Sequence, residues 1–309
     1  MAAVTAAMVK ELREMTGAGM MDCKKALANT DGDMDKAVEY LRENGMAKAA
    51  KKAGRIAAEG IVKTVVEGTK AAIVEVNSET DFVAKNADFN AYVEDVAAQA
   101  LTTKAADIDA FLAESWNKDS SKTVADALAG QIAVIGENLK IRRFAQLEEA
   151  NGFIASYIHM GGKIGVLVDV ETDVVNDAVK EMAKNIAMQV AAIKPVYTNR
   201  GEVDQEYIEK EKEILTVQAK NEKPDANDKI ISGMVMGRIN KELKEICLLD
   251  QVYVKAEDGK QSVSQYVAQV AKANNAKVAI KKFVRFETGE GLEKKEENFA
   301  DEVAKQMGM

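Results

Sequence analysis

Residues 60–83 read GIVKTVVEGTKAAIVEVNSETDFV, and residues 152–175 read GFIASYIHMGGKIGVLVDVETDVV. Each stretch holds two short runs rich in β-branched residues with glycine between them, which is the pattern of a strand pair. When the stretches are aligned without a gap, their first glycines match, and so do the ETD tripeptides that begin at Glu79 and Glu171. We therefore predict an internal duplication of a strand–strand–helix unit. Chance similarity is the alternative, because short units of this kind share periodicity.

The chain before the first strand pair predicts three short helices within residues 1–45. The first ends near Gly17, since glycine suits a helix end. Asp22 is placed to cap the second helix, and Asp33 to cap a third that ends at Gly45. The next ten residues, MAKAAKKAGR at 46–55, are basic and rich in alanine. We interpret them as a solvated helix end or linker, with a phosphate-binding patch as the alternative.

The remaining pattern completes an α+β fold. We expect helices near 89–101 and 124–135, a strand near 139–147, and a helix ending near Ile193. An antiparallel helical hairpin is predicted at about 205–246, broken at Lys223-Pro224. A short helix near 262–271, a strand at 278–286 and an amphipathic helix near 296–306 follow. The predicted domains are 1–54 (three helices and linker), 55–147 (first core subdomain), 148–288 (second core subdomain with the hairpin) and 289–309 (a C-terminal helical module).

Composition narrows the function classes. The formal net charge of −8 argues against a general nucleic-acid binder, which needs a positive surface to displace counterions. No apolar run is long enough for a signal peptide or a bilayer span, so we expect no membrane partner and a cytoplasmic location. The two cysteines, Cys23 and Cys247, form neither a disulfide framework nor a metal cluster and suit a reducing compartment.

The residues that usually carry enzyme chemistry are scarce. His159 is the only histidine, and its neighbours Met160-Gly161-Gly162 indicate a turn, which favours a structural or interface role. No Cys and His spacing indicates zinc, and no segment completes a phosphate-binding loop. We predict a protein that is not an enzyme and has no cofactor or metal of its own.

Two longer segments resemble a known family. Residues 12–27, LREMTGAGMMDCKKAL, and residues 75–85, EVNSETDFVAK, are similar to the two signature motifs of the elongation factor Ts family. The resemblance extends over nearly the whole chain. It implies an N-terminal domain of ubiquitin-associated type, two related core subdomains with a helical hairpin inserted in the second, and a C-terminal helical module. It also implies that the protein accelerates GDP release from elongation factor Tu.

The resemblance assigns roles to particular residues. It implies that one loop dislocates the Mg²⁺ of elongation factor Tu, through Thr80, Asp81, Phe82 and Val83. It further implies partner contacts by Arg13, Met20, Met21 and His159. A phenyl ring at a loop tip is a rigid wedge that can enter an apolar slot. The gap-free alignment of the two repeats places Val174 at the position of Phe82.

Several alternatives stay open at this stage. Asp81 could instead be a helix N-cap, Phe82 could pack in the core, and one of Met20 and Met21 could fill the core of the helical head. The protein could also be a passive scaffold or holdase for the GTPase, or an RNA- or ribosome-binding protein. The sequence leaves open whether a homodimer or a 2:2 complex forms.

Overall fold

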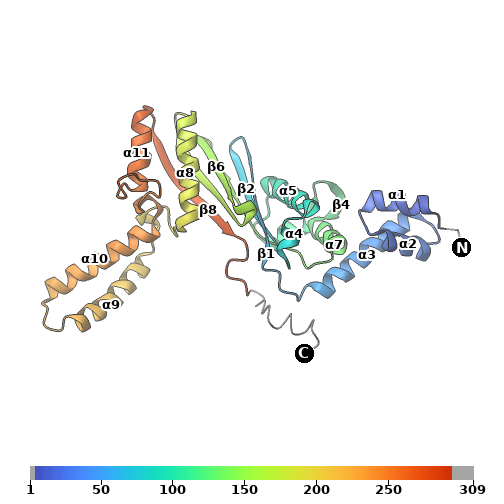
Figure 1. The fold of residues 1–309 in the computed structure, drawn as a ribbon, viewed down its shortest axis with the longest axis horizontal. Coiled ribbons are helices and arrows are strands. Elements are labelled where there is room, and N and C mark those ends of the chain that lie inside the picture. The colour runs from blue at the N-terminus through green and yellow to red at the C-terminus, as the bar shows by residue number, and fades with distance from the viewer. Residues whose placement is uncertain (1–3, 294–309) are drawn as a thin grey trace.

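The computed structural model describes residues 4–293 as an elongated molecule with a helical head, a two-sheet core and a projecting helical hairpin (Figure 1). The head and the hairpin lie at opposite ends, and the core lies between them. The helix predicted near 296–306, and with it most of the predicted C-terminal module, lies outside the described residues.

The head contains three helices, α1 (Ala6–Thr16), α2 (Met20–Asn29) and α3 (Met34–Lys52). Gly17 caps the end of α1, and the Asp33 carboxylate caps α3 by accepting from the N–H of Lys36, as the sequence predicts. The prediction for Asp22 is wrong, because α2 begins after Gly19 and Asp22 pairs instead with Lys48, 2.9 Å away. The small core of the head consists of Val9, Leu12, Cys23, Ala26, Leu27 and Ala37.

Helix α3 does not end at Gly45 but continues through the predicted linker to Lys52. Gly45 is buried there, and a Cβ added to it would lie 3.7 Å from Ala133 Cβ and from the carbonyl oxygen of Ala129. Both residues belong to α7 (Val124–Ile135). The alanine-rich segment is therefore helix packed against the core at its start, and the head is attached through a continuous helix.

The core contains two three-stranded antiparallel sheets of the same topology. The first has the order β1 (Glu59–Glu67), β2 (Lys70–Ser78), β5 (Lys140–Glu148), and the second has the order β6 (Gly152–His159), β7 (Ile164–Thr172), β8 (Val278–Glu287). Apolar side chains from both sheets form one shared cluster, which includes Val62, Ile73, Leu147, Ile154, Leu167 and Phe286. Helix α5 (Ala87–Thr102) packs on the first sheet and α8 (Asp177–Ile193) packs on the second.

The strand register supports the duplication but corrects its alignment. Two residues join β1 to β2, whereas Met160–Lys163 join β6 to β7. Ser78 and Thr172 therefore correspond, and each donates its hydroxyl to the carbonyl two residues ahead, at 3.0 and 3.1 Å. In this register Glu171 corresponds to Asn77, so the two ETD tripeptides differ in position by two residues. Val174 therefore corresponds to Thr80 and not to Phe82.

The first glycine of each strand pair is required for a steric reason within its own hairpin. A Cβ on Gly60 would clash with the carbonyl oxygen of Val76, and a Cβ on Gly152 would clash with that of Val170. The middle strand of each sheet also has an irregularity at the same place, between Glu75 and Val76 and between Asp169 and Val170. Two halves that share these details are most simply copies of one unit.

The helical hairpin is present as predicted. Helices α9 (Gln205–Glu222) and α10 (Asp228–Ile246) flank Pro224, and the predicted apolar stripe of α10 is buried against α9. The second core subdomain also contains α11 (Val263–Ala273). The sequence does not predict several short elements of the first core subdomain, among them α6 (Ile108–Ala113), β3 (Ser115–Trp116) and β4 (Asp119–Thr123). None of the helices described in residues 4–293 is both long and apolar enough to cross a bilayer.

Candidate partner-binding site

The most exposed large apolar side chain among the described residues is Phe82, at 82%. It lies on α4 (Asp81–Ala84), a single turn that projects after β2. Thr80 is the N-cap of this turn, since its hydroxyl accepts from the N–H of Val83 at 3.3 Å. Two alternatives are thereby corrected: the Phe82 ring does not pack in the core, and Asp81 is not the cap.

Helix α4 is an insertion relative to the second repeat. In the first repeat, seven residues separate the end of β2 at Ser78 from Asn86, which caps α5. In the second repeat, three residues separate Thr172 from Asn176, which caps α8. The extra turn carries Phe82, so this exposed ring has no counterpart in the other copy.

Asp81 is an ionised surface carboxylate. Its side chain accepts from Lys85 Nζ at 2.6 Å, and this bond lowers the pKa of Asp81, with a smaller contribution from Lys163. The carboxylate therefore stays negatively charged beside Phe82 at neutral pH.

Glu137 holds the start of this loop. Its carboxylate accepts from the N–H groups of Glu79 and Thr80, both at 3.0 Å, and from the Thr80 hydroxyl at 2.7 Å. Glu79 in turn accepts from the N–H of Asn138 at 2.6 Å. Glu137 was not predicted from the sequence, because no local pattern links it to a loop 57 residues earlier. The loop that presents Phe82 is thus fixed at its base.

A second exposed turn lies near α4. His159 is half-buried at the end of β6, where its Nδ1 lies 2.9 Å from the Tyr157 hydroxyl, and Met160 beside it is 73% exposed. Lys163 completes the turn by binding Glu59, and its charge reaches Asp81. The fold therefore brings the predicted His159 and the Phe82 loop to the same end of the core.

The predicted contact residues of the head form a separate surface. Met20 is 59% exposed and Met21 is 73% exposed, and Arg13 and Met15 are also exposed. Neither Met20 nor Met21 fills the core of the head. Helices α1 and α2 lie far from α4 (Figure 1), so these residues do not share a site with Phe82.

The two cysteines do not add a reactive site. Both are buried, and this burial raises the pKa of each thiol. Within residues 4–293, no three His, Cys, Asp or Glu side chains are grouped so that they could hold a metal ion.

Large apolar side chains are exposed at three places, on the head, on α4 and on the turn after β6, and exposed apolar side chains of this kind are typical of surfaces that bind another macromolecule. Comparison with known proteins makes the class specific. A family model described as elongation factor TS matches residues 79–290. The chain is 55% identical to elongation factor Ts of Clostridioides difficile (strain 630) over 309 residues, covering 99% of this chain and 100% of the relative. It is 54% identical to elongation factor Ts of Clostridium botulinum (strain Eklund 17B / Type B) over 308 residues, covering 99% of each. The chain belongs to the elongation factor Ts family and is a translation elongation factor.

Proposed function

We propose that this protein is the guanine-nucleotide exchange factor of elongation factor Tu. The observation that carries the proposal is the Phe82 ring, held in solvent on a loop whose base is fixed by Glu137. A pre-organised aromatic tip loses little conformational entropy when it enters an apolar slot on a partner. Membership in the elongation factor Ts family supplies the identity of that partner.

Exchange requires that the factor bind the nucleotide-free GTPase more tightly than the nucleotide-bound form. Linkage is reciprocal, so nucleotide must weaken the factor's own binding by the same ratio. Mg²⁺ is a sensitive target for such an effect, because it neutralises the phosphates and protein side chains supply few of its ligands.

The four loop residues have distinct parts in this proposal. Phe82 wedges into the GTPase, and the adjacent Asp81 brings a negative charge towards a site that already holds phosphate. Thr80 caps the turn and Val83, which is half-buried, supports it. Together they displace Mg²⁺ and so promote GDP release. The protein forms no covalent bond in this process and acts only through binding.

The other projections serve docking. Arg13, Met20 and Met21 on the head bind the GTPase domain, since exposed methionines adapt to varied apolar surfaces. His159 and Met160 contact a different domain of the same partner. Three contacts on one molecule raise the affinity beyond that of any one contact.

The direct test is release of fluorescent GDP from purified elongation factor Tu with and without this protein. We expect a faster release that saturates as the factor is added. No acceleration at micromolar concentrations would remove the proposal, and binding without acceleration would instead favour a passive scaffold.

A further inference from the structure

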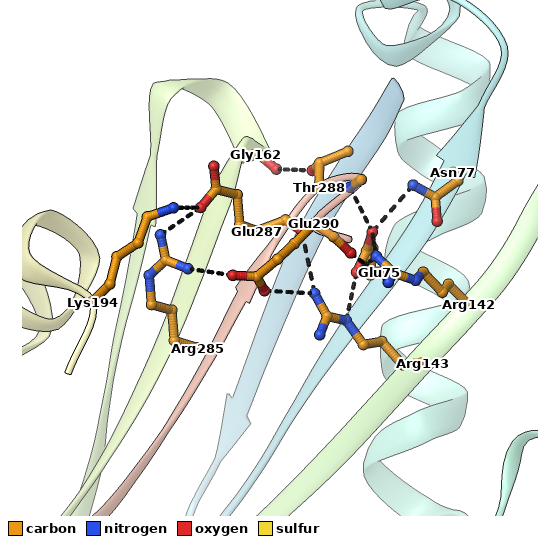
Figure 2. Close-up of polar contacts among 11 residues, drawn as sticks. Glu75, Asn77, Arg142, Arg143, Gly162, Lys194, Arg285, Glu287, Thr288 and Glu290 are labelled. Atoms are coloured by element: carbon orange, nitrogen blue, oxygen red, sulfur yellow. Dashed lines mark hydrogen bonds and ion pairs between the residues drawn. The ribbon is translucent and has the colours of Figure 1, made fainter. Parts of the chain in front are cut away.

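Glu75 is a fully buried carboxylate in the middle of β2. Burial of a carboxylate is costly unless hydrogen bonds and opposite charges compensate for the lost water. Glu75 accepts from Arg142 Nη1 at 3.0 Å, Arg143 Nε at 2.5 Å, Asn77 Nδ2 at 3.1 Å and the N–H of Gly289 at 2.8 Å. Figure 2 shows Arg142 and Arg143 reaching the carboxylate from β5 and Asn77 reaching it from β2 itself. Gly289 lies in the segment that follows β8.

The segment after β8, Thr288–Glu290, is held from both sides. On one side, Arg142 donates to the carbonyl of Glu290 at 2.5 Å, and Gly289 donates to Glu75. Gly289 has a φ of 71°, and a Cβ there would clash with the carbonyl oxygen of Ala58, so this position requires glycine. The segment therefore has one position relative to the first sheet.

On the other side, the same segment holds the exposed turn Met160–Lys163. The N–H of Thr288 donates to the carbonyl of Lys163 at 2.9 Å, and its hydroxyl donates to the carbonyl of Gly162 at 3.1 Å. Thr288 is buried, so water cannot replace these bonds without a rearrangement. A continuous chain of bonds thus runs from Glu75 through Gly289 and Thr288 to the turn (Figure 2).

The second repeat offers a comparison for Glu75, because the equivalent position of β7 is also a buried carboxylate, Asp169. Asp169 occupies the place of Glu75, at the equivalent irregularity of β7, and it pairs across the sheet with Lys282 where Glu75 pairs with Arg143. Asp169 Oδ1 is buried without any hydrogen-bond partner. The turn between β1 and β2, at Gly68-Thr69, is the counterpart of Met160–Lys163 and carries no large apolar side chain. The equivalent backbone bond is present there, since the N–H of Glu149 donates to the carbonyl of Thr69 at 2.9 Å. The fully hydrogen-bonded carboxylate and the exposed Met160 are therefore what distinguish the half that contains Glu75.

We propose that Glu75 and Thr288 are positioning residues for nucleotide exchange, which set the spacing between Phe82 and Met160 so that both contact the same partner at once. Glu75 lies on the strand that leads to α4, and Thr288 holds the turn that carries Met160. The inference rests on the proposed function. Neither residue needs to touch the partner, since each acts through the position of a contact residue.

The decisive experiment is a double-mutant cycle with Met160→Ala and Thr288→Val, in which GDP release from elongation factor Tu is measured over a range of factor concentrations. Thr288→Val keeps the shape of the side chain and removes the bond to Gly162. We expect it to lower the rate below saturation about fivefold, the equivalent of one hydrogen bond, with a melting temperature within a few degrees of the wild type. Met160→Ala should lower the rate in the wild-type background but change it less than about twofold in the Thr288→Val background.

A purely structural role would leave the effect of Met160→Ala equal in both backgrounds, and that result would overturn the inference. Glu75→Gln provides a second variant, expected to lower exchange more than about fivefold, and Asp169→Asn is its matched control, expected to exchange like the wild type. Equal losses in these two variants would also contradict the inference. If Glu75→Gln does not fold, the cycle decides alone.

The wild-type protein separates this inference from the proposed function. If it binds elongation factor Tu without accelerating GDP release, the proposed function fails. Dissociation constants of the same four proteins for the nucleotide-free GTPase then still test whether Thr288 sets the spacing between Phe82 and Met160. Absence of any binding would overturn both.

Discussion

At the scale of single residues, the Phe82 ring should separate function from stability. Truncation of an aromatic anchor at an interface typically costs at least about 2 kcal/mol, which is more than tenfold in a rate or an equilibrium. The ring buries almost nothing in the free protein. We therefore expect Phe82→Ala to lower the GDP-release rate at least about tenfold and to leave the melting temperature nearly unchanged.

Val175 provides the matched control for this prediction. It is a half-exposed apolar residue after β7, in the repeat that lacks α4, so Val175→Ala should alter neither exchange nor melting. A Phe82→Ala protein that exchanged normally would show that the loop is not the active contact.

Asp169 predicts a pH dependence of stability. Burial, followed by the carboxylate of Glu149, raises the pKa of Asp169 from 3.8 to about 6, against smaller opposite effects of Lys282 and Lys281. The folded state then binds this proton more tightly than the unfolded state, so the contribution of Asp169 to stability is most favourable below about pH 4. It is lost as the pH rises through about 6.

Asp169→Asn removes this titration and keeps the shape of the side chain. We expect the variant to melt above the wild type at pH 7.5, with a difference that shrinks towards pH 4. Melting temperatures of both proteins between pH 4 and 8 measure this. A constant difference over that range would show that Asp169 does not titrate as described.

At the scale of elements, the sequence predicted long, regular segments well and missed short, irregular ones. Pro224 and the apolar stripe of α10 defined the hairpin, because proline breaks a helix and burial follows its period. Helix α4 has only four residues and shows no period. Its insertion was also concealed, since two extra residues in the turn after β6 kept the ETD tripeptides at equal spacing.

The candidate site was predictable only where neighbours in sequence are neighbours in space. The exposed loop around Phe82 was found from its motif, whereas Glu137, which fixes it, and Thr288, which holds the Met160 turn, are distant in the chain. Of the two interpretations of residues 46–55, a helix end is correct through Lys52, but the end of α3 was predicted at Gly45 because the contact of Gly45 with α7 leaves no pattern in the sequence.

The hairpin should adjust partner affinity without carrying the exchange step. The N–H groups of Val196 and Tyr197 both donate to the carbonyl of Ile246, at 2.8 and 3.1 Å, so the end of α10 is tied to the segment that follows α8. Tyr207 binds Glu242, which brings the two helices together near that end. Replacement of residues 205–245 by a short linker should therefore preserve the fold and some GDP-release activity. Complete loss of activity in a well-folded variant would contradict this.

At the scale of the whole molecule, the head should be required for docking but not for folding of the core. Its own apolar cluster is separate from those of the two sheets. Deletion of residues 1–54 exposes small side chains of α7 and removes the ion pair of Arg42 with Asp126. We expect the truncated protein to melt a few degrees lower and to bind elongation factor Tu much more weakly. Titration calorimetry measures the affinity, and full-rate exchange at low concentration would exclude the docking role.

Helix α3 also couples its packing on the core to the position of the head. Its 19 residues give a length of about 28 Å, with α1 and α2 on one end and the Gly45 contact with α7 towards the other. Gly45 lies eleven residues from the start of α3, an arm of about 17 Å, so a tilt of about 10° there would move that end of the helix by about 3 Å. A single enlarged side chain at Gly45 would therefore displace the exposed Met20 and Met21 relative to the core while every helix and sheet stayed intact.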